Sequence, residues 1–266
     1  MDCTINICVL NWNGGDDLLA CINSIENNDS NDYQITVIDN NSYDNSIDKL
    51  PNTVKVVKLN KNFGFGVGYN KGISKSFNSD DYLVLLNPDT IVASDFVESI
   101  INTIKEKGKQ HIYGAKILFH HKPDIIWYGG GVLDLTAGII SHRLLRTRNN
   151  SKVERKPTDF VTGCCLIIHN EIFSQLGGFD PRFFMYNEDV DLCLRAKEIG
   201  ISCIYDSRIK VFHKVSLSLG GNYSIKKIVK KSISTWLLYN KYYPVYKSLP
   251  LFCLYLLKTI LGVRYE

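Results

Sequence analysis

The sequence predicts an α/β fold built around a Rossmann-like, mainly parallel central sheet with flanking helices. Strand-like and helix-like segments alternate over the first 110 residues, and polar residues follow the end of each predicted strand. Alternation of this kind is typical of βαβ units. The chain has 266 residues, of which 45% are hydrophobic, so we expect one large domain with a full core and a small appendage.

The individual elements follow from hydrophobic periodicity. Apolar runs rich in β-branched residues predict strands over residues 5–10, 34–38, 54–59 and 82–86, and helical spacing predicts helices over 17–25, 66–77 and 96–104. Periodicity weakens over residues 112–160, where Gly129, Gly130 and Gly131 are consecutive, so we expect an irregular or hairpin-rich insertion there. Further along we expect a strand over 160–168, a helix over 188–199 and short strands over 201–205 and 209–212.

Cysteine usage and the first residues both favour a cytoplasmic protein. The eight cysteines lie mostly in apolar runs and form no CxxC pair, which indicates reduced core thiols, with a zinc or disulfide role as the alternative. Residues 1–4 lack the basic start of a signal peptide and lead straight into a predicted strand.

Charge is distributed unevenly along the chain. Residues 206–266 contain eleven Lys or Arg and two acidic residues, a balance of +9, whereas residues 1–205 carry −5, and the two add to the net +4. A basic C-terminal segment behind an acidic body predicts an anionic surface as partner.

Polar side chains follow the predicted strands of the first half. Asn11, Asp39, Asn62 and Asp89 come directly after the first, second, third and fourth strand or within three residues of its end. Ligands of open α/β sheets bind at the carboxyl ends of the strands, and an acid after the second strand is placed to hydrogen-bond a nucleoside. The alternative for Asp39 is a turn or helix cap formed with Asn40, Asn41 and Ser42.

Two loops suggest nucleotide and metal binding. The glycine loop Asn62-Phe63-Gly64-Phe65-Gly66-Val67-Gly68-Tyr69-Asn70 allows close approach of the backbone to a nucleotide, or else is a purely structural turn. Asn87-Pro88-Asp89 has the spacing of an acid-x-acid metal site with an amide in the first place. The alternative is a proline turn with a capping acid. His213, at the end of a predicted strand, is either structural or a further metal ligand.

A cluster of acids begins the helix expected over 188–199. Glu188, Asp189 and Asp191 fall in its first turn, directly after Phe183, Phe184, Met185 and Tyr186. Acids at a helix start complement the helix dipole. An apolar wall beside them also raises the pKa of a carboxylate toward that of a working general base, so the sequence predicts proton abstraction here.

Taken in order, these motifs resemble family 2 glycosyltransferases, in particular the bacterial rhamnosyltransferase-like branch. The resemblance spans roughly residues 5–220 and includes Thr162-Gly163-Cys164-Cys165 and Gly177-Gly178-Phe179-Asp180 besides the loops above. It implies a GT-A fold, a nucleotide-sugar donor, Mg²⁺ or Mn²⁺ as cofactor and inversion at the anomeric carbon. Residues 1–110 would form the nucleotide-binding half and 111–220 the acceptor-binding half of one catalytic domain.

The resemblance also implies roles for individual residues. Asp189 would be the catalytic base, with Glu188 as the other candidate or an acceptor ligand. Asp89 and His213 would bind the metal, and Tyr186 and Asp191 the acceptor. The donor would be held by Asn11, Asp39, Asn41, Asn62, Gly66, Asn70 and Asn87. Asn87 departs from the pattern, since many relatives carry Asp there.

Residues 221–266 predict a basic amphipathic helical tail. Its apolar stripe consists of Ile225, Ile228, Val229, Ile233, Trp236 and Leu237, and its flanking lysines are Lys226, Lys227, Lys230 and Lys231. The apolar run Leu249–Leu257 is too short to cross a bilayer alone. A helix of this kind lies in the membrane interface, so we expect a peripheral enzyme on the cytoplasmic face of the cell membrane. The alternative is packing on the catalytic domain or in a homodimer.

The expected reaction is transfer of a sugar from dTDP-rhamnose or a UDP-hexose to a hydroxyl of a glycan or lipid-linked acceptor of a bacterial surface polysaccharide. No nucleic acid partner is expected. A sugar nucleotidyltransferase is the enzymatic alternative, although the loop after the first strand contains Asp16 and Asp17 and no basic residue. A catalytically inactive carbohydrate-binding scaffold is the non-enzymatic alternative.

Overall fold

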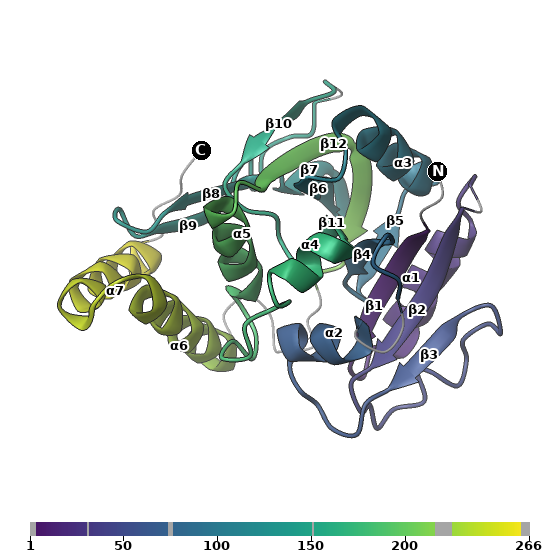
Figure 1. Ribbon diagram of the computed structural model, residues 1–266, viewed down its shortest axis with the longest axis horizontal. Coiled ribbons are helices and arrows are strands. Elements are labelled where there is room, and N and C mark those ends of the chain that lie inside the picture. Colours follow the sequence, from purple (N-terminus) through teal and green to yellow (C-terminus); the bar gives the residue numbers. More distant parts are fainter. Residues whose placement is uncertain (1–3, 31, 74–76, 151, 216–224, 262–266) are drawn as a thin grey trace.

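The computed structural model describes the whole chain except residues 1–3, 31, 74–76, 151, 216–224 and 262–266 (Figure 1). The strands are β1 (Ile5–Asn11), β2 (Tyr33–Asp39), β3 (Lys55–Lys58), β4 (Tyr82–Leu86), β5 (Thr90–Val92), β6 (His111–Phe119), β7 (Lys122–Tyr128), β8 (Gly131–Asp134), β9 (Ile139–His142), β10 (Arg155–Thr158), β11 (Cys165–His169) and β12 (Ser202–His213). The helices are α1 (Gly15–Glu26), α2 (Phe65–Ile73), α3 (Phe96–Lys107), α4 (Asn170–Gln175), α5 (Glu188–Glu198), α6 (Ile225–Tyr242) and α7 (Val245–Ile260).

One central sheet has the strand order β10-β12-β6-β11-β4-β1-β2-β3, with β5 paired to β12 and β7 paired to β6. Strands β3, β2, β1 and β4 run parallel to one another, as alternation of strands and helices predicts. β11 lies antiparallel between β4 and β6, and β12 runs parallel to β6. The carboxyl ends of β1, β2, β4 and β12 therefore meet at one edge of the sheet.

Helices cover the two faces of this sheet. The connection through α1 moves from β1 to β2, whereas the connection through α2 moves back from β3 to β4, so right-handed crossovers place α1 and α2 on opposite faces. α4 and α5 lie on the same side as α2 (Figure 1). Because α5 runs back along the sheet before β12 begins at Ser202, its first turn lies at the edge where the strands end.

The middle of the chain is more regular than the expected insertion over 112–160, and that prediction is wrong for its first part. β6 is a nine-residue strand in the centre of the sheet. Gly114 and Lys116 interrupt its apolar pattern, but Gly114 packs against Val161, and the buried Lys116 donates a hydrogen bond to Asn149 Oδ1 at 3.1 Å. Hairpins do occur further on, as β6–β7 and β8–β9.

Other boundaries also differ from expectation. The two short strands expected over 201–212 are one strand, β12, with an irregularity between Asp206 and Lys210. The strand expected from Phe160 begins only at Cys165, because residues 160–164 form a loop and turn. α4 was not expected. Cys8, Cys21, Cys164, Cys165, Cys193 and Cys203 are buried free thiols, whereas Cys253 is exposed, and Cys3 lies outside the described residues.

The C-terminal segment forms the helix pair α6 and α7, which lies beside α5 and the β8–β9 hairpin, away from β1–β3 (Figure 1). The buried face of α6 consists of Ser234, Thr235, Leu238 and Tyr239. It is not the predicted stripe, since Ile228, Val229 and Ile233 are each about half exposed, and the side chains of Ile225 and Lys226 lie outside the described residues. Within the described ranges, no helix has the length and apolar character needed to cross a membrane.

Candidate functional site

The ends of β1 and β2 are joined by a buried polar network. Asn11 donates through Nδ2 to Asp39 Oδ1 at 3.1 Å and to the hydroxyls of Ser42 and Ser46 at 3.0 and 2.9 Å. Asp39 Oδ2 also accepts the backbone N–H of Ser42 at 3.3 Å, which is a turn contact. Asn11 and Asp39 are both buried. These two residues, predicted to bind the nucleotide sugar, therefore contact each other at the expected edge of the sheet.

Asn40 is a site residue that the sequence analysis missed. Its Nδ2 donates to Asn62 Oδ1 at 3.1 Å and to the Gly64 carbonyl at 2.9 Å, and its Oδ1 accepts the N–H of Phe63 at 2.9 Å. Asn62 in turn accepts the N–H of Gly64 at 2.8 Å. These bonds fix the glycine loop to the end of β2. The adjacent Asn41 is exposed and left-handed, with a φ of 63°.

Gly66 and Asn70, two further predicted nucleotide-sugar ligands, both pack against Phe179. A Cβ at Gly66 would lie 2.7 Å from that of Phe179, so this glycine is required for close packing. Asn70 Nδ2 donates to the Phe179 carbonyl at 2.7 Å, and its Oδ1 accepts the Phe179 N–H at 2.9 Å. Both ends of the amide are thus occupied by backbone. These contacts give both residues a structural role in joining α2 to the segment around Phe179.

Asp89 and His213 form the candidate metal pair. His213 Nε2 lies 3.2 Å from Asp89 Oδ1, and both side chains are largely buried. Because β12 runs in the same direction as β4, their ends bring together residues 124 positions apart in the sequence. His213 Nδ1 is buried and has no hydrogen-bond partner among the residues that the structure describes. Asn87, the amide of the motif, is half-buried and bonds to Cys164 through its backbone N–H.

The donor set at this pair fits part of the shell of a divalent cation. A carboxylate oxygen and an imidazole nitrogen are both ligands of Mn²⁺, and a nucleotide diphosphate would supply further oxygens. No cluster of three or more His, Cys, Asp or Glu ligands occurs in the described part of the chain. A metal held by this protein alone would therefore lack ligands that a bound diphosphate and water provide.

Glu188 and Asp189 occupy the first turn of α5. Asp189 is half-buried, and its two oxygens accept the N–H groups of Gly163 and Val190, each at 2.8 Å. Glu188 is buried, and its Oε2 has no partner within the described ranges. Burial raises the pKa of both carboxyls, most strongly that of Glu188, where the neighbouring Asp189 adds to the effect. The expected direction of the pKa shift is confirmed.

The backbone before α5 is held in an unusual conformation. Tyr186 and Asn187 are both left-handed, with φ values of 72° and 60°, which is uncommon for residues with side chains. α6 holds this turn, because Ser234 Oγ donates to the Tyr186 carbonyl and Asn187 Nδ2 donates to Thr235 Oγ1 at 3.0 Å. Contacts from the tail therefore hold the turn that leads into Glu188 and Asp189, a connection that sequence periodicity does not indicate.

Asp191 is not available to an acceptor, which contradicts its predicted role. Its side chain is fully buried and pairs with Arg195 at 2.8 Å and with Lys241 at 2.5 Å. Tyr242 also donates to Asp191 Oδ1 at 2.9 Å. Asp191 instead joins α5 to the end of α6. Tyr186, the other predicted acceptor residue, is half-buried beside Glu188.

Gly163 and Cys164 connect the two acidic sites. Gly163 donates its N–H to Asp189, and the carbonyl of Cys164 accepts the N–H of Asn87 at 3.0 Å. Two adjacent residues thus contact the base candidate on one side and the loop of Asp89 on the other. The acids, a hundred positions apart in the sequence, belong to one site.

Trp127 and His142 border this site and were also missed. The Trp127 ring meets the His213 ring edge to face at 4.6 Å between centroids and the His142 ring at 4.5 Å. Both residues are half-buried. Burial lowers the pKa of His142 to about 4, so this imidazole is neutral at pH 7. They come from β7 and β9 in the segment expected to be irregular, where no periodicity marked them.

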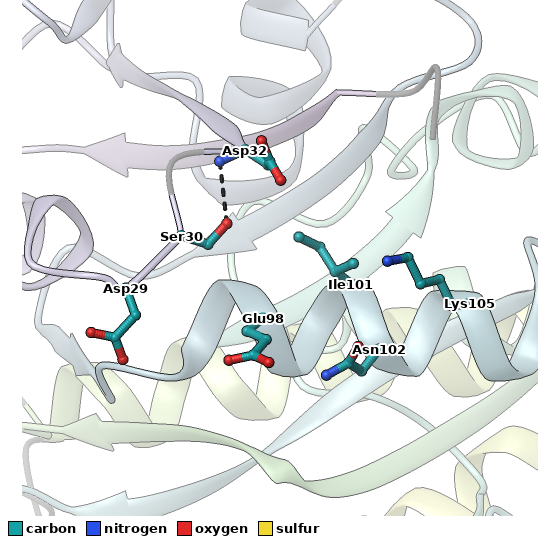
Figure 2. A pocket seen from close by; sticks show the side chains of 7 residues that line it. All are labelled: Asp29, Ser30, Asp32, Glu98, Ile101, Asn102 and Lys105. Atoms are coloured by element: carbon teal, nitrogen blue, oxygen red, sulfur yellow. Dashed lines mark hydrogen bonds between the residues drawn. The ribbon is translucent and has the colours of Figure 1, made fainter.

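An open groove of about 540 Å³ lies elsewhere, between α3 and the turn before β2. Figure 2 shows its lining residues, Asp29, Ser30, Asp32, Glu98, Ile101, Asn102 and Lys105. The turn leads into the amino end of β2, whereas Asp39 stands at its carboxyl end. This groove is therefore remote from the polar network, and its exposed carboxylates lack the buried partners found at the strand ends.

Comparison with known proteins agrees with this geometry. The profile of glycosyl transferase family 2 matches residues 6–177, which is more than half of the chain. An N-acetylglucosaminyl-diphospho-decaprenol L-rhamnosyltransferase of Mycobacterium tuberculosis is 24% identical over 212 residues, covering 70% of this chain and 68% of the relative. The rhamnosyltransferase WbbL of Escherichia coli is 26% identical over 165 residues, covering 57% of this chain and 60% of WbbL.

Solved structures show the same fold. GalNAc-T7, crystallised with UDP, GalNAc and Mn²⁺, superposes with a TM-score of 0.63 at 18% identity over 79% of this chain. TarS of S. aureus superposes with a TM-score of 0.58 at 14% identity over 89% of this chain. The matched region is 43% of each of those two longer chains. The fold is thus GT-A, as expected. The family profile ends before Glu188, so the matched region does not include the base candidates.

Proposed function

This chain belongs to glycosyl transferase family 2, and we propose that it transfers a sugar from a nucleotide-diphosphate sugar to a hydroxyl of a glycan or lipid-linked acceptor, with inversion at the anomeric carbon. The observation that carries the proposal is the Gly163–Cys164 connection, which unites a raised-pKa carboxylate with the Asp89–His213 pair. Transfer to a hydroxyl requires one group to take a proton and another to stabilise a departing diphosphate.

In this proposal Asp189 is the base. It takes the proton of the acceptor hydroxyl while that oxygen bonds to the anomeric carbon, and the bond from this carbon to the donor diphosphate breaks on the opposite face. The nucleoside diphosphate leaves with the bonding electrons, so no covalent enzyme intermediate is needed. Asp189 is preferred over Glu188 because it is partly accessible, whereas Glu188 is buried.

The donor is assigned to the carboxyl ends of β1, β2 and β4. Asp39 would bind the ribose or base beside Asn11, with Asn41, Asn62 and Asn87 around it. Asp89 and His213 would hold Mg²⁺ or Mn²⁺, which neutralises charge on the leaving diphosphate when bound. Likeness to the two rhamnosyltransferases favours dTDP-rhamnose as donor, with UDP-hexoses as the other candidates. The name of the first relative favours a sugar carried on a lipid diphosphate as acceptor.

Replacing Asp89 by Ala is expected to weaken donor binding in the presence of Mn²⁺, since it removes the charged half of the pair. Losing one charge-assisted contact costs about 1.5–3 kcal/mol, which is roughly ten- to a hundredfold in Kd. Titration calorimetry with a panel of nucleotide sugars, with Mn²⁺ and then with EDTA, measures this. Asp95→Ala is the matched control, because this acid is exposed to solvent beside Lys210. Wild-type activity that survives exhaustive chelation would remove the metal from the mechanism.

The tail is proposed to bind an anionic membrane surface on the cytoplasmic side. Ile228, Val229 and Ile233 on α6, and Val245, Tyr246, Leu249, Leu257 and Ile260 on α7, are about half exposed or more. Between residues 227 and 261 the chain contains six lysines and no acidic residue. Exposed apolar residues with lysines around them match a membrane interface, where each lysine near an anionic leaflet contributes about 1 kcal/mol.

The protein is expected to sediment with vesicles containing anionic lipid and to be released by high salt. Ile233→Asp, which places a charge on the exposed apolar side of α6, should abolish this binding without unfolding the chain. Thermal denaturation of the variant checks the fold. Equal sedimentation with neutral and anionic vesicles, or with neither, would instead assign the apolar surface to packing against a second subunit, which gel filtration would then reveal.

A further inference from the structure

The position of Lys231 relative to the catalytic turn suggests a second function for α6. α6 and α5 run side by side in the same direction, since Asn187 contacts Thr235 and Asp191, one turn later, contacts Lys241 and Tyr242. Lys231 precedes Thr235 by four residues and so lies on the same face of α6, one turn further toward its start. Because Thr235 already contacts Asn187, the residue before α5, the turn of α6 that carries Lys231 lies beyond the amino end of α5, near Asp189.

Lys231 is exposed and forms no ion pair or hydrogen bond with the residues that the structure describes. Its charge nevertheless acts on two groups of the site. It lowers the pKa of Asp189, which burial raises, and it lowers the pKa of His142, which burial also lowers. An exposed cation that acts on both groups, and that has no ion pair with any described residue, is available to an anionic ligand. Lys230, the next residue, instead lies over the Phe184 ring at 5.8 Å.

Trp127 forms the opposite border of the same space. Its half-buried ring contacts both His213 and His142 edge to face, so it lies next to the metal pair and next to the histidine on which the charge of Lys231 acts. A flat aromatic surface with a few polar groups around it is suited to a sugar ring. His142 is neutral at pH 7 and can therefore hydrogen-bond a sugar hydroxyl without repelling Lys231.

We infer that Trp127, His142 and Lys231 form the acceptor subsite, in which Trp127 packs against the acceptor sugar and Lys231 binds a phosphate attached to it. The ligand class is a sugar phosphate or diphosphate whose free hydroxyl faces Asp189. This inference rests on the proposed function, since it requires Asp189 to be the base. It also gives the tail a direct part in acceptor recognition, because Lys231 belongs to the helix that carries the exposed apolar residues.

The test is calorimetric titration of the full chain with two probes, hexyl-diphospho-N-acetylglucosamine and hexyl N-acetylglucosaminide. Wild-type protein should bind the diphosphate probe about ten- to a hundredfold more tightly, as one charge-assisted phosphate contact provides. Lys231→Met should remove this difference and leave binding of the uncharged probe unchanged. Lys247→Met, which removes an equal charge from the exposed surface of α7, should behave as wild type. Trp127→Ala should weaken both probes.

Three results would overturn the inference. Lys231→Met could bind both probes as wild type does, or lose affinity for both equally, or wild-type protein could show no preference for the diphosphate. Titration with nucleotide sugars on the same samples separates the two levels of the proposal. Donor binding without a diphosphate preference refutes the subsite alone, whereas failure to bind any nucleotide sugar refutes the proposed function.

Discussion

Asp189→Asn is expected to lower kcat by about three orders of magnitude or more and to leave donor binding intact, since general-base catalysis contributes roughly 10²–10⁴-fold. The amide keeps the size of the carboxylate and can still accept one of its two backbone hydrogen bonds. What it loses is the ability to take a proton. Steady-state kinetics of transfer, together with titration of the nucleotide-sugar donor, measure the two effects separately.

Glu188→Gln is the matched control at the adjacent position. Glu188 Oε2 is buried without a partner in the described part of the structure, and burial favours the protonated, neutral form of this side chain. A neutral amide of equal size is therefore expected to retain most activity. The opposite pattern, with an active Asp189→Asn and an inactive Glu188→Gln, would transfer the role of base to Glu188.

The same assignment predicts the direction of the pH dependence. A general base must be ionised, so activity falls as the pH drops through its pKa. Because burial raises the pKa of Asp189, the acidic limb of the kcat profile should lie above the ordinary range for an aspartate. An acidic limb at the ordinary pKa of Asp would indicate that a solvated carboxylate acts instead.

Asp191→Ala is expected to destabilise the fold by about 3–5 kcal/mol, the usual cost of removing one partner from a buried ion pair. It leaves Arg195 and Lys241 without their shared carboxylate and deletes the hydrogen bond from Tyr242. For a chain of this size, thermal denaturation should show a Tm lowered by roughly 6–20 °C. Asp16→Ala, which breaks an exposed pair with Lys49, should cost at most about 1 kcal/mol.

A Tm for Asp191→Ala within the range of the Asp16→Ala control, combined with a higher KM for the acceptor, would contradict the structural role. Asp191 would then return to its predicted function as an acceptor ligand. Because Asp191 links α5 to α6, its loss should also loosen the turn that holds Asp189, so a fall in kcat that accompanies destabilisation agrees with the structural role.

The parallel half of the fold could be predicted because its signals are local. β1, β2 and β4 are largely buried runs rich in apolar residues, and the order of strands and helices limits the topology. β6 could not be predicted, because Gly114 and Lys116 break its pattern and their partners, Val161 and Asn149, lie more than thirty residues away. A sequence pattern shows apolar periodicity, but it does not show the tertiary contacts that allow a glycine or a buried lysine within a strand.

In the candidate site, too, local signals could be read from the sequence and distant contacts could not. Asn11, Asp39, Asp89 and His213 were predicted together because all of them follow strands, and the ends of parallel strands meet in space. The partners of Asn70 and Asp191, in contrast, come from distant segments, the backbone of Phe179 and the side chains of α6, and no sequence pattern indicates them. For a polar residue near a site, the sequence does not distinguish a ligand contact from a tertiary hydrogen bond.

For the C-terminal tail, the sequence predicted a helix but not which of its sides packs on the domain. Its helical stripe was recognised, but the side of α6 that packs carries Ser234 and Thr235, which bond to the turn before α5. Hydrophobic periodicity located an apolar stripe on α6 but did not show whether it packs on the protein or faces outward. In the structure Ile228, Val229 and Ile233 of this stripe are exposed. Ser234 and Thr235 hold the turn formed by Tyr186 and Asn187, and the left-handed conformations of these two residues are visible only in the structure.

The central claim is direct displacement of a nucleoside diphosphate at the anomeric carbon, assisted by Asp189. Time-resolved NMR of slow donor hydrolysis tests it without knowledge of the acceptor, because water can take the place of the hydroxyl. With Mn²⁺ and a panel of dTDP- and UDP-sugars, the first free sugar released should have the anomeric configuration opposite to that of the donor, and Asp189→Asn should release it far more slowly. A first product that retains the donor configuration, or an absence of nucleotide release from every donor, would contradict the mechanism.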